Sequence, residues 1–171
     1  MTGPSEELSR HCEAIEGAYE FMLAYAGQGL PRDQGSKAGA QIREHLRRMD
    51  DALGGLADLF ARAAAERRLS CATQIEAFLR VLRRDADASQ AAVQLTLAQP
   101  SIGSQLVDNL NASIHLRALL TDLFLLDEIL KSHDTAERAA RAESQSASTA
   151  GLSRHEPDDR HPQHGRTDPG P

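Results

Sequence analysis

Residues 114–130 read IHLRALLTDLFLLDEIL, the most apolar stretch in a chain of 171 residues. Within it, leucines recur at alternating steps of three and four residues. That spacing marks one face of an α-helix that packs along its length against other helices. The members of this stripe are Leu116, Leu119, Leu123, Leu126 and Leu130. Because no segment alternates apolar and polar residues as a strand does, the sequence predicts an all-α fold.

Three earlier stretches carry stripes with the same helical spacing. Their members are Leu8, Cys12, Ile15, Tyr19, Met22 and Ala26, then Ile42, Leu46, Met49, Leu53, Leu56 and Phe60, and then Ile75, Leu79, Leu82, Ala86, Ser89 and Val93. Loop-forming residues between the stripes predict helices at about 5–26, 37–68, 71–99 and 101–135. Since the connections are short, we expect an antiparallel four-helix bundle of long helices within residues 5–141, after a short disordered N-terminus at 1–4.

Two adjacent glycines, Gly54 and Gly55, lie inside the second predicted helix. Each costs about 1 kcal/mol relative to alanine in a helix interior. The pair therefore predicts a bend in this helix or a close approach of another helix.

The composition changes near the end of the chain. Residues 142–171 are rich in Ser, Pro, His, Asp and Arg, and Leu152 is their one large aliphatic residue. A segment with so little apolar surface cannot offset the entropy lost on folding, so we expect a disordered polar tail. Its histidines, His155, His161 and His164, suggest a weak metal site or a short docking peptide, and a merely solubilising extension is the simpler interpretation.

The charge of the chain limits its partners. Its formal net charge of −6 argues against general binding to nucleic acid or acidic membranes, because a basic surface supplies most of that affinity. The stretch 114–130 is interrupted by His115, Arg117, Asp122 and Asp127, so we expect no membrane span. The first ten residues lack the apolar core of a secretion signal, and two cysteines form no dense framework. We therefore expect a cytoplasmic protein.

The fourth predicted helix is apolar on more than one side. Besides its leucine stripe it carries Ile114, Leu120, Phe124, Leu125 and Ile129, which fall on other faces of the same cylinder. A helix in a single bundle normally keeps one side in water. Either the other helices wrap this one, or a second subunit or a partner protein covers it. These five residues are the predicted partner-binding surface.

Histidines and carboxylates beside the stripes suggest a metal-binding bundle instead. No Glu has a His three residues later, and Ile15, Met49 and Leu119 stand four residues after His11, His45 and His115, where an iron-binding bundle would have Glu or His. In a heptad frame, however, His11, His45 and His115 all fall at position g, beside the core. Glu16 and Asp122 add carboxylates on the first and fourth predicted helices. If two of these histidines met, they could hold a metal with those carboxylates.

Motifs of nucleophilic or nucleotide chemistry are missing from the sequence, which has no GxSxG, GxxxxGK or GxGxxG. We therefore favour a protein that is not an enzyme and has no cofactor. The prediction is an accessory, adaptor or chaperone-like assembly protein that pairs with itself, or with another protein, through the fourth helix. The alternative is a metal-binding bundle of oxidase, storage or sensor type. A third interpretation is a scaffold that docks through its tail.

Overall fold

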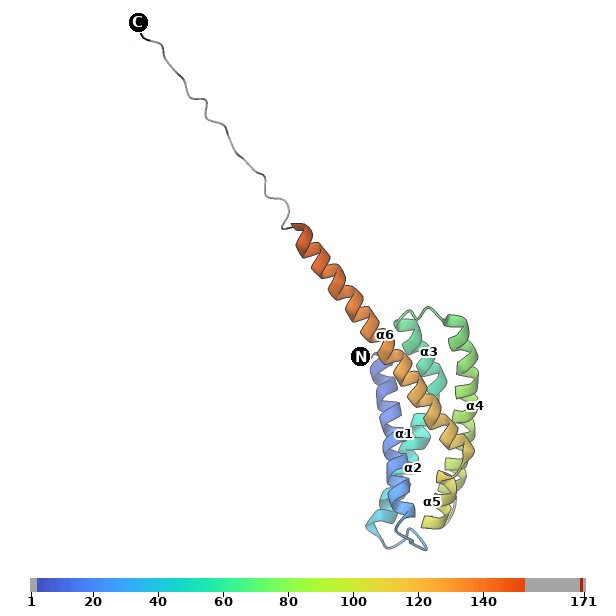
Figure 1. Cartoon of the computed structure of the whole chain (residues 1–171). Coiled ribbons are helices and arrows are strands. Elements are labelled where there is room, and N and C mark those ends of the chain that lie inside the picture. The colour runs from blue at the N-terminus through green and yellow to red at the C-terminus, as the bar shows by residue number, and fades with distance from the viewer. Residues whose placement is uncertain (1–2, 153–169, 171) are drawn as a thin grey trace. The chain divides into compact units, whose positions relative to one another are not determined.

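In the computed structural model, which describes residues 3–152 and 170, the chain is all-helical (Figure 1). This part contains six helices and no strand, so the all-α prediction is confirmed. The helices are α1 (Pro4–Ala26), α2 (Lys37–Leu53), α3 (Leu56–Glu66), α4 (Ala72–Leu97), α5 (Ser104–Asn111) and α6 (Ile114–Leu152). The chain divides into two units, Met1–Lys131 and Ser132–Pro171, and the boundary falls inside α6.

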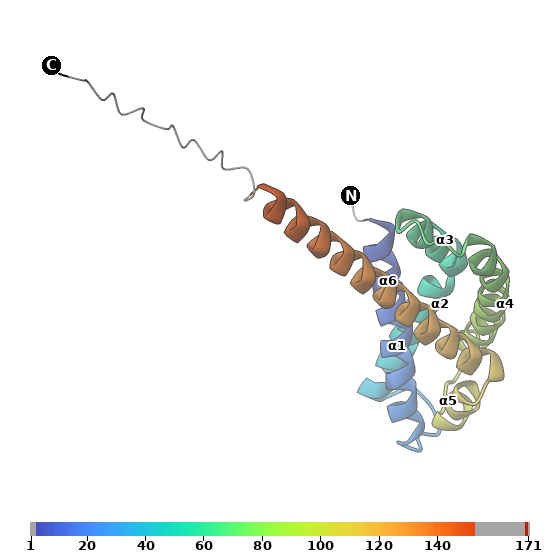
Figure 2. The same cartoon turned by 45° about the horizontal axis from the view of Figure 1, so that its top comes forward.

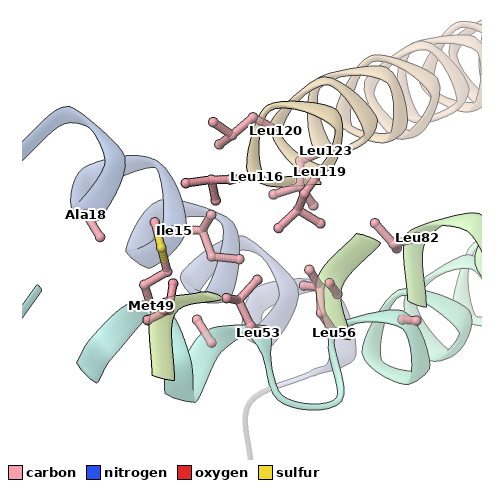
Figure 3. Close-up of a cluster of buried hydrophobic side chains, with 14 of the residues drawn as sticks. Ile15, Ala18, Met49, Leu53, Leu56, Leu82, Leu116, Leu119, Leu120 and Leu123 are labelled. Atoms are coloured by element: carbon pink, nitrogen blue, oxygen red, sulfur yellow. The ribbon is translucent and has the colours of Figure 1, made fainter. Parts of the chain in front are cut away.

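The first unit is built around the packing of α1 and α4 on the shorter helices. Each of these two long helices contacts α2, α3 and α5. Within this unit, the first part of α6 crosses diagonally over α1 (Figure 1 and Figure 2). Its leucine stripe faces inward: Figure 3 shows Leu116, Leu119 and Leu123 pointing toward Ile15 of α1. All three leucines are buried, so this part of α6 covers one side of the hydrophobic core.

The second predicted helix is two helices in the structure, because the expected bend is a complete break. Gly54 has an extended conformation and ends α2. Gly55 has φ +72°, in the left-handed region where glycine carries no steric penalty, and precedes α3. The pair redirects the chain while Leu53 and Leu56 on either side stay buried.

The fourth predicted helix is also divided, into α5 and α6, at Ala112 and Ser113. Neither residue is glycine or proline, so the break carries no strong signal in the sequence. Asn111 and Ser113 are residue types with low helix propensity, which is a weaker signal for a helix end. With six helices in place of four, the simple four-helix bundle is not confirmed.

Helix α6 continues beyond the predicted end of the bundle. It reaches Leu152, so residues 142–152 are helical where the sequence predicted disorder. Three alanines favour a helix here, and just before this stretch Arg141 forms an ion pair with Glu137 one turn earlier at 2.8 Å. Residues 153–169 of the predicted tail, with His155, His161 and His164, lie outside the described residues.

A buried polar network joins the loop before α2 to the loop after α4. Asp33 forms an ion pair with Arg43, and its other carboxylate oxygen accepts a hydrogen bond from the Ile102 backbone N–H at 2.8 Å. Arg43 also donates to the carbonyl oxygens of Leu97 at 3.2 Å and Gln99 at 3.0 Å. One arginine thus satisfies carbonyl groups that the end of α4 leaves without helical partners.

Candidate functional site

The outer face of α6 is the most apolar exposed surface of the first unit. Ile114 is 76% exposed, Phe124 58%, Leu125 49% and Ile129 40%. These are four of the five residues predicted to bind a partner. Leu120, the fifth, is only 7% exposed and belongs to the core. It comes four residues after Leu116 and three before Leu123, so it borders the inward stripe, and its assignment to the partner surface was wrong.

An apolar groove runs along one side of this face. It has a volume of about 220 Å³ and lies where α4, α6 and the loop between α3 and α4 meet. Its walls include Leu69, Ile75, Phe78, Leu125 and Ile129. The sequence pointed to Leu125 and Ile129 but not to Leu69 or Phe78. Phe78 lies beside the predicted stripe of its helix. Its large apolar side chain is the sequence feature that could have indicated its place in the groove.

An open hollow lies elsewhere along the same helix. Its volume is about 490 Å³, and its lining consists of Ala112, Ile114, Arg117, Ala118 and Thr121. Ala118 and Thr121 are small, so the helix surface is low between the exposed side chains of Ile114 and Arg117 and that of Phe124. Just beyond the hollow along the helix stands the exposed ring of Phe124. The surface therefore has a depression and a projection on one helix.

The predicted metal-binding histidines are each engaged by a different neighbour. His11 donates from Nδ1 to the Ala52 carbonyl oxygen at 2.9 Å. His45 stacks on Phe21 with ring centroids 4.2 Å apart. His115 lies with Nδ1 3.8 Å from a carboxylate oxygen of Asp85. Across the described ranges, no three His, Cys, Asp or Glu side chains gather closely enough to hold a metal. The structure does not bring the three histidines together.

The predicted carboxylate ligands lie among other acids. Burial, and then the charge of Asp127, raise the pKa of Glu16 above its usual value. Burial, and then the charge of Asp85, raise the pKa of Asp122, whose buried Oδ2 has no hydrogen-bond partner among the described residues. These carboxylates belong to two separate groups, one where α1 faces α6 and one where α4 faces α6.

Cys12 is unsuited to nucleophilic chemistry. Burial, followed by the charges of Glu16 and Asp127, raises the pKa of its thiol to about 11. The reactive thiolate is therefore scarce at neutral pH. Cys12 instead packs against the hydrophobic core, in keeping with its place on the first helical stripe.

Comparison of the chain with protein-family models, curated proteins and solved structures finds no match. In the part that the structure describes, none of the helices combines the length and apolar character needed to cross a bilayer. The groove, the hollow and the exposed face of α6 are therefore the features from which a function must be argued.

Proposed function

We propose that this chain is a non-enzymatic accessory or adaptor protein that binds an amphipathic helix of a partner protein in the apolar groove beside α6. The observation that carries this proposal is the continuous apolar surface formed by the groove and the exposed side chains of Leu125 and Ile129. Large exposed apolar patches on a folded chain typically mark sites of protein contact.

The size and lining of the groove favour a side chain as its occupant. At about 220 Å³ it falls below the roughly 300–1,000 Å³ typical of small-molecule sites. Its apolar walls offer little to orient a polar metabolite. A helix-in-groove contact needs a depression that takes one or two anchor side chains, flanked by further apolar residues. Phe78 and Ile75 on α4 form one wall, and Leu125 and Ile129 on α6 form the other.

The metal-binding alternative has less support from this geometry. Each of the three histidines contacts a different neighbour, and the carboxylates near α6 lie in separate groups. We further propose a cytoplasmic location, since Cys12 and Cys71 are both free thiols.

The test is site-specific photo-crosslinking in the cell of origin, from a photoreactive residue at position 125. We expect a discrete crosslinked partner, and we expect Ile129→Glu in the same chain to reduce its yield about tenfold or more, because the groove wall would then carry a charge. Position 95 provides the matched control. Leu95 is 68% exposed on α4 and lies outside the groove, so Leu95→Glu leaves the crosslink intact. Equal yields from both variants would contradict the proposal.

A further inference from the structure

We propose that the hollow on α6 and the ring of Phe124 form a self-complementary surface through which two copies of this chain pair with their α6 helices antiparallel. This contact lies beside the apolar groove and does not use it. The inference rests on the proposed function in one respect only, that α6 is an interaction surface. It adds the identity of one partner, a second copy.

The first support is the position of the projection relative to the hollow. Thr121 and Arg117 line the hollow, and Phe124 follows Thr121 by three residues on the same side of the helix. In an antiparallel pair related by a two-fold axis, each residue faces a residue of the second copy. That second residue lies equally far from the axis, in the opposite direction along its own helix. Helical side chains lean about one position toward the N-terminus. An axis between Thr121 and Asp122 therefore brings Phe124 over Thr121 of the second copy.

The second support is the charge on the same face. Arg117 and Glu128 are both exposed, and each lies on the sector of the helix that also carries Thr121 and Phe124, which spans about 60° at 100° per residue. The axis that seats Phe124 also brings Arg117 opposite Glu128 of the second copy, and symmetry makes this pair twice. A parallel pair in register would instead oppose arginine to arginine and glutamate to glutamate. The charges thus specify both a second copy and its direction.

The apolar residues at the edges fit the same arrangement. Ile114 is 76% exposed and lies only about 20° from Thr121 around the helix, so it borders the paired face. Ala118 and Thr121 are small, so the two helices can approach closely at the centre. Phe124 then loses its contact with water, as the aromatic anchor of an interface does.

The experiment is light scattering of the full-length chain over a wide range of concentrations. We expect a mass that rises with concentration toward twice the 18.5 kDa of one chain. Phe124→Asp should weaken this association by about 30-fold or more, which is the effect of losing a central anchor worth about 2 kcal/mol. Leu95→Asp, at an exposed apolar position on α4, should leave the association unchanged, and circular dichroism should show equal helicity in all variants.

A charge exchange tests the direction of the pair. Arg117→Glu and Glu128→Arg should each weaken association about five- to tenfold, since each creates two like-charge contacts. The double variant should recover wild-type affinity within about twofold, because the exchanged charges again face each other. A monomer at every concentration, or a double variant no better than the single ones, would overturn the inference.

The two proposals fail separately. Ile129→Glu should reduce the crosslink in the groove about tenfold or more but leave the self-association measured by light scattering unchanged. If the chain is monomeric while crosslinking from position 125 persists, the pairing is wrong and the adaptor function stands. If the chain pairs as expected but position 125 crosslinks to no partner, the adaptor function is wrong and the pairing stands.

Discussion

Arg43 and Asp33 show how one ion pair holds together two loops far apart in the sequence. Burial by itself would raise the pKa of Asp33, but the hydrogen bonds from the Ile102 N–H and from Arg43 outweigh burial and lower that pKa. Tyr25 adds a further link, since its hydroxyl donates to the Ile102 carbonyl at 2.7 Å. The charged form of Asp33 is therefore the one that stabilises this end of the molecule.

The pH dependence of stability follows from that lowered pKa. An unfolded aspartate ionises near pH 3.9, and the folded Asp33 ionises at a lower pH. Its contribution is therefore fully present above about pH 4 and is lost as the pH falls through the folded value. We expect Asp33→Asn to lower the free energy of unfolding at pH 7 by about 1–3 kcal/mol. Urea denaturation should show that the difference in the free energy of unfolding between wild type and variant becomes smaller at acidic pH. A difference that stays constant with pH would contradict the prediction.

At the scale of the helices, α6 carries two faces with opposite roles. Leu119 is fully buried, whereas Ile114, five residues earlier, is 76% exposed. Figure 3 shows Leu119 directed into the cluster that also contains Leu53 and Leu82. The inner face stabilises the fold, and the outer face is available for contact with another molecule.

A pair of alanine substitutions separates these roles. Leu119→Ala should lower the free energy of unfolding by about 2–5 kcal/mol, because it leaves a cavity in the core. Ile114→Ala should change it by no more than about 0.5 kcal/mol when measured in dilute solution, where self-association is minimal. Denaturant titration of both variants checks the expectation. Similar losses for the two would mean that Ile114 is buried in solution.

The leucine stripe was predictable because its spacing is strict and its residues are large, and all five members are buried. The outer face was predictable for four residues out of five, and it failed at Leu120 because periodicity does not give the width of the buried face. The groove could not be predicted, since Leu69 and Phe78 come together with Ile129 only through the tertiary fold. The division between α5 and α6 was missed because Ala112 and Ser113 are weak breakers.

At the scale of the whole molecule, the hydrophobic core lies within the unit Met1–Lys131. Its last buried apolar residue is Leu130, one position before the unit ends. Residues 132–146, whose side chains the structure describes, are exposed or only partly buried. The side chains described at residues 132–146 are therefore not members of the buried core.

A truncated chain tests this division. Removing residues 132–171 should change the free energy of unfolding by less than about 1 kcal/mol, because none of the residues that form the described core is removed. The far-ultraviolet circular dichroism per molecule should fall, since the helical residues 132–152 are removed. A loss of cooperative unfolding in the shortened chain would show that the second unit contributes to the stability of the first.

Cys71 provides a thiol in the lining of the groove that can be labelled. It lies in the lining beside Ile75, and its residue is exposed, whereas the thiol of Cys12 has its pKa raised to about 11. Because maleimides react with the thiolate, a dye added at neutral pH attaches at position 71 in preference to position 12. The native chain can thus carry a fluorescent reporter beside the apolar groove without any change to its sequence.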